Sequence, residues 1–223
     1  MELSPALILA LWTGGIGAGA ALVAFWDVVG PGFLWVSAGT VVLFGALAVV
    51  AGGGTGAIAG IVFAVVAAAV ARRRIPAVVA FAAAAASFAL VALRGSSPLL
   101  VLTGLAAFGG ITTEMLLGHW FLVDPRLPRR PLRILSVLGG SAMALDLVVS
   151  WLLARPSFSG PDGVLAMAFA VLGPFTVLLM VGVRRALDEP GYSGVMAATG
   201  LSYLAVLTSL GAVTLGRILV AGS

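Results

Sequence analysis

The sequence predicts an all-α, polytopic integral membrane protein with about eight transmembrane helices, and three observations predict this class. Of the 223 residues, 61% are hydrophobic and only 9% are charged, and the mean hydropathy is +1.20. A globular chain carries about a quarter charged residues, so a water-soluble fold with this composition would lack polar surface. The apolar runs are about twenty residues long, as a helix that crosses the bilayer requires. They lack the alternating pattern of membrane-barrel strands, which leaves helices as the spanning structure.

The apolar runs divide the chain, in order, into eight expected spans. These cover residues 6–26, 33–51, 55–71, 75–93, 98–123, 132–154, 164–183 and 193–220. The breaks between them contain charged residues, prolines or glycines, at residues 27–31, 52–54, 72–74, 94, 124–131, 155–156 and 184–190. Charges and prolines end apolar helices firmly, whereas glycine also occurs inside membrane helices. The three glycines at 52–54 are therefore the weakest break, and seven spans is the alternative count.

The twelve basic residues are all arginines, and their distribution predicts the orientation of the chain. With eight spans, nine of them lie on one side: Arg72, Arg73, Arg74, Arg126, Arg129, Arg130, Arg133, Arg184 and Arg185. The other three are Arg94, Arg155 and Arg217. Arginine is enriched in cytoplasmic loops, so we expect the nine to face the cytoplasm and both termini to lie outside a plasma membrane. This pattern accounts for the net charge of +4 without a nucleic-acid partner.

A single transmembrane domain, residues 1–223, is expected, and its halves, residues 1–95 and 96–223, share several features. Each half opens with a glycine-rich helix that ends near a tryptophan, Trp26 or Trp120. In each half the third helix ends in arginines that are followed shortly by proline. Because four spans restore the starting side, these features favour two parallel four-helix units. The alternative is that glycine, tryptophan and arginine occupy these places for general membrane reasons.

Missing residue types exclude several kinds of chemistry. The chain has no cysteine, which excludes disulfides, thiolate catalysis and cysteine-ligated metal clusters. It has no lysine, so Schiff-base chemistry has no residue to use. A single histidine excludes a bis-histidine haem, and no nucleotide-binding, serine-hydrolase or zinc-protease motif is present. We therefore expect no metal and no cofactor held within the chain alone, with a quinone as the one cofactor to consider.

Glu114 and Asp146 are the two carboxylates expected deep inside spans. Glu114 lies nine residues, about 13 Å, from the end of the fifth span, and Asp146 lies about 21 Å into the sixth. A charge at the bilayer centre costs at least about 2.5 kcal/mol, so such residues usually face the protein interior and often mark a site. One interpretation is a role in handling protons, ions or a polar ligand. The other is a structural acid that is hydrogen-bonded to a backbone carbonyl or a nearby hydroxyl. The hydroxyls considered are those of Thr112, Thr113 and Ser141.

His119, the only histidine, is expected near the cytoplasmic mouth of the fifth span. It follows Glu114 by five residues, about 140° around a helix, so a straight helix does not bring the two together. A proton-relay or quinone-contacting role is one interpretation, and an interfacial hydrogen bond beside Trp120 is the other. The prolines that follow predict an ordered cytoplasmic corner beneath His119, which is also suited to dock a partner. Its charged residues are Asp124, Arg126, Arg129, Arg130 and Arg133.

Three functions are compatible with these features. The leading expectation is a membrane subunit of a larger redox or energy-conserving assembly, handling protons or a quinone through Glu114, His119 and Asp146. It rests on the lack of a domain in water, which leaves electron carriers and catalytic bulk to a partner. The second is a small permease for an ion or weakly polar solute, and the third is an intramembrane enzyme that acts on lipid. The leading expectation assigns no catalysis to the isolated chain. Its partners are the lipid bilayer and either other membrane subunits or further copies of this chain.

Overall fold

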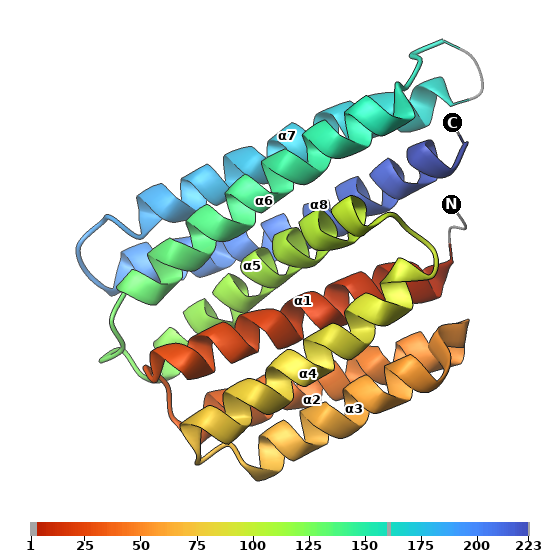
Figure 1. Ribbon diagram of the computed structural model, residues 1–223. Coiled ribbons are helices and arrows are strands. Elements are labelled where there is room, and N and C mark those ends of the chain that lie inside the picture. The colour runs from red at the N-terminus through yellow and green to blue at the C-terminus, as the bar shows by residue number, and fades with distance from the viewer. Residues whose placement is uncertain (1–3, 160–161, 223) are drawn as a thin grey trace.

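The computed structural model describes residues 4–159 and 162–222, and every regular element in these ranges is a helix (Figure 1). The long helices are α1 (Pro5–Trp26), α2 (Pro31–Ala48), α3 (Gly54–Ala69), α4 (Arg74–Leu93), α5 (Pro98–Val123), α6 (Arg130–Ala154), α7 (Gly163–Ala186) and α8 (Tyr192–Gly222). A short π-helical turn, η1 (Val49–Gly53), joins α2 to α3. Large apolar side chains such as Leu43, Leu90 and Leu102 are exposed on the outside, as a lipid-facing surface requires. The helical membrane class predicted from the sequence is confirmed.

Seven helical stretches in the described ranges are long and apolar enough to cross a membrane, rather than the expected number of about eight. The difference lies in Pro31–Ala69, where α2, η1 and α3 form one helical stretch of 39 residues. This stretch is not straight, because Gly52 and Gly54 have φ angles of +100° and +63°. Glycine adopts such backbone angles without steric cost. The chain folds back at these glycines, and α2 and α3 lie side by side (Figure 1).

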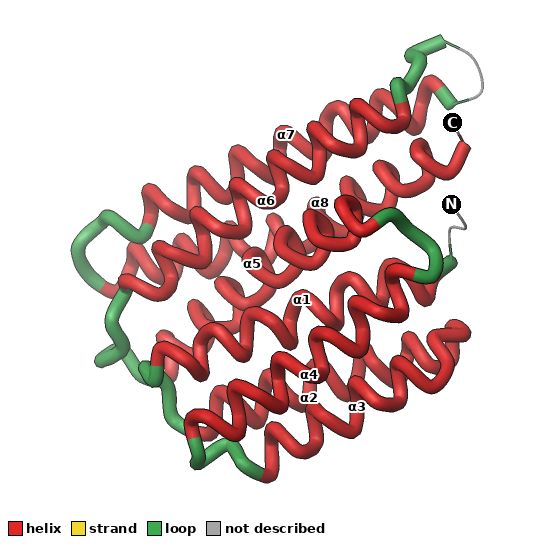
Figure 2. The backbone as a smooth tube through the Cα atoms, in the orientation of Figure 1, coloured by secondary structure: helices red, strands yellow, loops and turns green. Residues whose placement is uncertain are grey.

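The helices lie roughly along one common axis, and the connections between them lie at the two ends of the bundle (Figure 2). The connections after α1, α3, α5 and α7 are at one end, whereas α1 begins and α8 ends at the other (Figure 1). Each of the nine arginines grouped by the sequence belongs to one of the first set of connections or to a helix end beside it. One end of the bundle is therefore rich in arginine.

The helices pack in two groups of four. In the first group α1 contacts α2, α2 contacts α3, α3 contacts α4, and α4 returns to α1. In the second group α5 to α8 repeat this order of contacts. The predicted neighbours α5 and α6 are indeed adjacent and antiparallel, because only a short connection separates them. The two groups meet mainly through α1 and α5, which lie next to each other in the middle of the molecule (Figure 1).

Two glycines make the contact between α1 and α5 possible. A Cβ atom placed on Gly15 would lie 2.6 Å from the backbone nitrogen of Gly109, and one placed on Gly109 would lie 2.5 Å from the backbone oxygen of Gly15. Neither position has room for a side chain, so the two backbones touch. One turn further along α1, Gly19 makes room for the side chain of Thr113. Small residues commonly allow this close approach between membrane helices.

The helices α1 and α5 also begin alike. Each starts with a serine followed by a proline, and the side-chain oxygens of Ser4 and Ser97 accept hydrogen bonds from the backbone N–H groups of Leu7 and Leu100. Serine is a favoured N-cap residue, and proline is favoured at the first helical position because its missing N–H is not needed there. The two central helices are therefore started by the same local signal.

Candidate functional site

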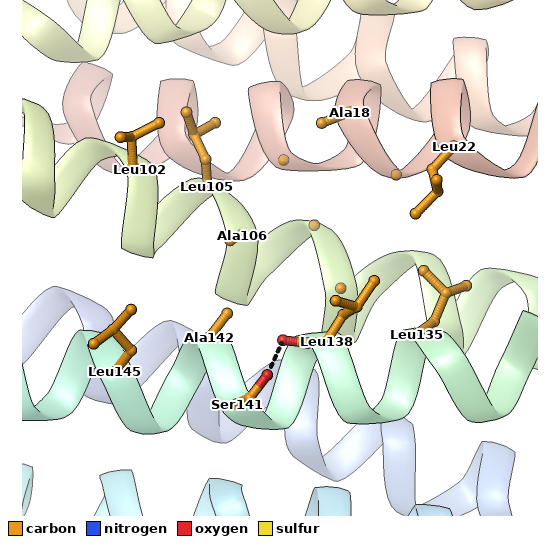
Figure 3. Close-up of a pocket in the computed structure, with 14 residues that line it drawn as sticks. Ala18, Leu22, Leu102, Leu105, Ala106, Leu135, Leu138, Ser141, Ala142 and Leu145 are labelled. Carbon is orange, nitrogen blue, oxygen red and sulfur yellow. Dashed lines mark hydrogen bonds between the residues drawn. The ribbon is translucent and has the colours of Figure 1, made fainter. Parts of the chain in front are cut away.

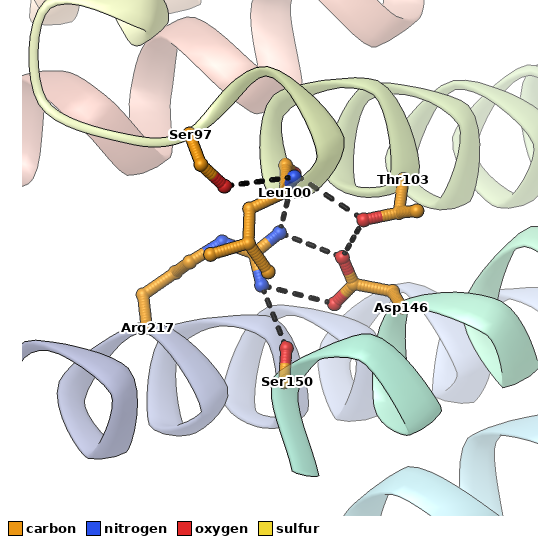
Figure 4. A network of polar contacts seen from close by, with 6 residues as sticks. All are labelled: Ser97, Leu100, Thr103, Asp146, Ser150 and Arg217. Carbon is orange, nitrogen blue, oxygen red and sulfur yellow. Dashed lines mark hydrogen bonds and ion pairs between the residues drawn. The ribbon is translucent and has the colours of Figure 1, made fainter. Parts of the chain in front are cut away.

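A buried ion pair connects α6 with α8 and with the beginning of α5 (Figure 4). Asp146 on α6 and Arg217 on α8 are both 0% exposed. The guanidinium group of Arg217 donates through Nη2 to Oδ1 of Asp146 at 2.6 Å and through Nη1 to Oδ2 at 3.2 Å. The hydroxyl of Thr103 on α5 also donates to Oδ1 of Asp146, at 2.5 Å. Both oxygens of the carboxylate are therefore bonded.

The remaining donors of Arg217 are almost all used. Nη1 also donates to the hydroxyl of Ser150 at 3.0 Å, and Nη2 also donates to the backbone oxygen of Leu100 at 2.7 Å. Only the Nε–H group lacks a partner among the described residues. A two-point pairing of this kind is the geometry that a guanidinium group makes with a carboxylate. The network joins three helices and leaves little bonding capacity for a ligand.

This network corrects two expectations from the sequence. Arg217 was assigned to the opposite side from the arginine-rich loops as a topology signal, but it is buried inside the bundle because α8 continues to Gly222. Asp146 was expected to bond to nearby hydroxyls or carbonyls if it had only a structural role, but its main partner is a cation. The signal was present in the sequence, since Arg217 lies within the expected span 193–220 and needs a counter-ion there.

Glu114 occupies a second buried position, between α5 and α8. Its side chain is 0% exposed, and Oε2 accepts a hydrogen bond from the hydroxyl of Ser202. Oε1 has no hydrogen-bond partner among the described residues, and no salt bridge to Glu114 occurs there. Glu114 therefore differs from Asp146 in having no cation and one unbonded oxygen.

The hydroxyls proposed as partners for Glu114 serve other contacts. Thr112 accepts a hydrogen bond from the indole N–H of Trp12 at 2.9 Å, and Thr113 packs against Gly19. Ser141 is exposed and donates to the backbone oxygen of Val137 at 2.7 Å. Ser202 lies on α8, 88 residues after Glu114 in the chain, so local spacing did not identify it.

The two buried carboxylates do not form one site. Glu114 lies on α5, and Asp146 is bonded to Thr103 of the same helix. Thr103 and Glu114 are eleven residues apart along α5. This separation corresponds to about 16 Å at 1.5 Å per residue. The prediction that both carboxylates point into the protein is confirmed, since both are completely buried. They lie on different levels of the bundle and have different partners.

His119 is separate from Glu114. It is exposed on α5, and its Nδ1 atom lies 3.5 Å from the hydroxyl of Tyr203, which is 46% exposed. The neighbouring residue on α8, Ser202, is the partner of Glu114. α5 is a continuous helix from Pro98 to Val123, and residues five apart on a helix point about 140° away from each other. The structure therefore places a buried carboxyl group and an exposed imidazole on different sides of the same two helices.

The predicted corner after α5 is an ordered, hydrogen-bonded region. Asp124 accepts a hydrogen bond from the backbone N–H of Arg126 at 3.3 Å. Arg129 donates to the backbone oxygen of Glu189 at 2.5 Å and also to that of Gly191. These bonds tie the connection between α5 and α6 to the connection between α7 and α8.

Asp188 provides the ionic part of this corner. Its carboxylate lies 2.6 Å from a guanidinium nitrogen of Arg184 and 3.2 Å from one of Arg133. The hydrogen bond from Arg184, together with the charges of Arg184 and Arg133, lowers the pKa of Asp188 below its usual value of 3.8. Arg126 and Arg130, by contrast, are exposed, and neither side chain forms a salt bridge within the described ranges. The corner thus keeps two arginines available to other molecules.

The described residues contain no group of three histidine, cysteine, aspartate or glutamate side chains that could hold a metal ion. The chain matches no protein-family model, no curated protein and no solved structure. Any functional assignment therefore has to come from the geometry of these residues.

Proposed function

We propose that this protein is a membrane subunit of a larger redox or energy-conserving assembly, in which Glu114 takes up and releases protons. The observation that carries the proposal is the environment of Glu114. Its carboxyl group is completely buried, with Oε2 bonded to Ser202 and Oε1 unbonded. Ionisable residues inside membranes commonly belong to functional sites such as proton relays.

A carboxyl group in this setting is suited to exchange a proton. Oε1 can carry the proton while Oε2 keeps its hydrogen bond to Ser202. Asp146 lacks this freedom, because both of its oxygens are bonded and Arg217 balances its charge. We therefore assign proton handling to Glu114 and a structural role to Asp146.

The proposal includes partner subunits and a quinone that diffuses in the lipid. Electron carriers would belong to other chains, and further copies of this chain are the other candidate partners. His119 on α5 and Tyr203 on α8 are both exposed, and together they offer a quinone carbonyl two hydrogen-bonding groups. Arg126 at the arginine-rich end is exposed and belongs to the surface that we assign to docking.

The two earlier alternatives receive less support. A permease in which Glu114 and Asp146 line one path requires the two carboxylates to share a route, but Asp146 is bonded to Thr103, which lies about 16 Å along α5 from Glu114. Asp146 is also fully occupied by Arg217 and Thr103. A lipid-acting enzyme with His119 as its base requires a lipid cavity that reaches His119, and the apolar groove between α1, α5 and α6 is not lined by that residue.

The replacement Glu114→Gln tests the proposal directly. An amide keeps a hydrogen bond to Ser202 but cannot carry the proton, so we expect normal folding and a loss of proton-coupled activity of about 100-fold or more. Activity is to be measured as proton uptake by membrane vesicles that contain the co-purified assembly. His119→Ala is expected to slow the same activity or to shift its pH dependence.

Two controls make this test specific. Asp188→Asn changes another carboxylate that lies outside the buried region, and it should leave proton uptake unchanged. Thermal unfolding should show that Glu114→Gln folds as the native chain does. Full activity in a well-folded Glu114→Gln variant would assign Glu114 a structural role only. Purification of the chain without any cofactor-bearing partner would contradict the assembly.

We further propose that α2 and α3 each cross the membrane, which gives eight passes with the arginine-rich end in the cytoplasm of a plasma-membrane protein. The helix α2 is 18 residues long, about 27 Å, and α3 is 16 residues long, about 24 Å. The bias of arginine towards one end supports the orientation. Cysteine is absent, so Arg126→Cys and Ser157→Cys each introduce one unique label site.

In intact cells an impermeant thiol reagent should label Ser157→Cys and leave Arg126→Cys unlabelled. Both variants should react after the membrane is permeabilised, which controls for local accessibility. Labelling of Arg126→Cys from outside, with Ser157→Cys protected, would show that the orientation is opposite to the one proposed. Equal labelling of both from outside contradicts their placement on opposite sides.

A further inference from the structure

An apolar groove opens between α1 and α6, with α5 as its floor (Figure 3). Its volume is about 580 Å³, within the range of about 300–1,000 Å³ that ligand sites occupy. Its walls include Ala18 and Leu22 from α1 and Leu138 and Ala142 from α6, with Ala106 on the floor. The one hydroxyl in the lining belongs to Ser141 and is already bonded to α6 itself. The groove is therefore suited to a hydrocarbon chain.

A separate cavity lies along the same two helices, nearer the arginine-rich end. This second cavity has a volume of about 380 Å³, and its lining includes Trp26, Arg130 and Ile134. Trp26 lies one helical turn beyond Leu22 on α1, and Ile134 lies one turn before Leu138 on α6, so the two cavities share the same helix faces. The distance along α6 from Arg130 to Leu145, at the far end of the groove, is fifteen residues, about 22 Å. That length exceeds one hydrocarbon leaflet, which is about 15 Å thick.

The matching place in the other half of the molecule is filled by aromatic side chains. Trp12 lies three residues before Gly15 on α1, and Ala106 lies three residues before Gly109 on α5. Trp12 contacts Phe44 of α2 with ring centres 4.6 Å apart and Phe108 of α5 at 5.6 Å. Where the first half has a tryptophan, the second half has an alanine that is exposed to the groove. The groove in the second half is therefore open at the place where aromatic side chains fill the first half.

The second cavity contains a positive charge that is suited to an anionic headgroup. Arg130 lines the outer cavity and forms no salt bridge within the described ranges, whereas Arg129 and Arg133 are bonded to the connection between α7 and α8. A guanidinium group binds phosphate oxygens in a two-point geometry. Trp26 beside it is a residue type that commonly lies at the level of lipid headgroups.

We propose that this groove binds one acyl tail of a phospholipid whose anionic phosphate headgroup pairs with Arg130. The tail follows α1 and α6 over the exposed Ala106, and the headgroup lies at the arginine-rich end between Trp26 and Arg130. This site is distinct from Glu114, which faces α8 and does not line the groove. The proposal is therefore independent of the proton-handling function.

Lipid retention tests the site. The protein is reconstituted in vesicles of equal amounts of phosphatidylglycerol and phosphatidylcholine, extracted in mild detergent, and examined by native mass spectrometry. The native chain should retain one lipid, mainly phosphatidylglycerol. Ala106→Trp copies the packing of Trp12 and should reduce the retained lipid by about tenfold or more, because the indole takes the place of the tail. Arg130→Gln should keep one lipid but lose the preference for phosphatidylglycerol.

Matched controls and a second variant keep the test decisive. Val79→Trp places the same side chain on the outer face of α4, at a residue 62% exposed, and should leave retention unchanged. Arg126→Gln removes a neighbouring arginine that does not line the cavity and should keep the lipid preference. If Ala106→Trp does not fold, Ala142→Phe fills the groove from α6 and should give the same loss. Unchanged retention in a folded groove-filling variant overturns the proposal, as does a native chain that retains no lipid or retains only an isoprenoid.

Discussion

Replacing Arg217 by methionine is expected to lower the free energy of unfolding by about 3–5 kcal/mol. The substitution leaves the carboxylate of Asp146 buried, with Thr103 as its one remaining side-chain donor. Removing one partner of a buried ion pair costs this much because the other charge stays uncompensated inside the protein. The methionine side chain is of similar length and apolar, so loss of packing contributes little to the expected change.

A double-mutant cycle measures the effect of this pairing. Asp146→Leu combined with Arg217→Met should recover most of the lost stability, because apolar residues often replace a buried ion pair without penalty. The free energy of unfolding is to be measured by denaturant titration in mixed micelles. Arg94→Met is the control, since Arg94 is exposed at the end of α4 and surface changes are usually within about 0.5 kcal/mol. A loss for Arg217→Met no larger than that for Arg94→Met would show that the pair is not needed for folding.

Adding a methyl group at Gly109 is expected to cost about 1–3 kcal/mol through overpacking. In Gly109→Ala the new Cβ atom would lie 2.5 Å from the backbone oxygen of Gly15, so the two central helices have to separate. A backbone atom cannot rotate away as a flexible side chain does. The separation affects the main contact between the two groups of four helices, so we expect a lower unfolding temperature and a less compact micelle complex.

Gly39→Ala provides the matched control for this prediction. Gly39 lies within α2, and a Cβ atom there has no neighbouring atom within 4 Å. The control should be neutral or stabilising by up to about 1 kcal/mol, because alanine favours helix over glycine. Thermal unfolding of the two variants in one detergent gives the comparison. Equal unfolding temperatures would contradict the close backbone contact between α1 and α5.

The positions of the helices are predictable from the sequence to within a few residues. The fifth span was expected at 98–123 and α5 is Pro98–Val123, and the fourth was expected at 75–93 and α4 is Arg74–Leu93. Charged residues and prolines mark these ends clearly, and lipid requires unbroken helices between them. The break between α2 and α3 was less clear, because glycine occurs both inside membrane helices and at places where the chain turns back.

The candidate residues were less predictable than the helices. The depth of Glu114 and Asp146 follows from counting residues, and both are buried as expected. Their partners, Ser202 and Arg217, lie 88 and 71 residues away along the chain. No local pattern links residues at such separations. Arg217 in particular has the sequence context of an end-of-helix arginine, and only the packing of α8 against α5 and α6 places it inside.

Taken alone, the sequence determined that this chain is a helical membrane protein with its arginines at alternate connections, because hydrophobic length and charge act locally and do not depend on neighbouring helices. The tertiary structure decided which helices touch, and therefore which buried group has a counter-ion. It showed that Asp146 is neutralised by Arg217, that Glu114 is not neutralised within the described residues, and that α1, α5 and α6 enclose an open groove. These properties depend on side chains from distant helices meeting in space, and helix packing alone sets those meetings.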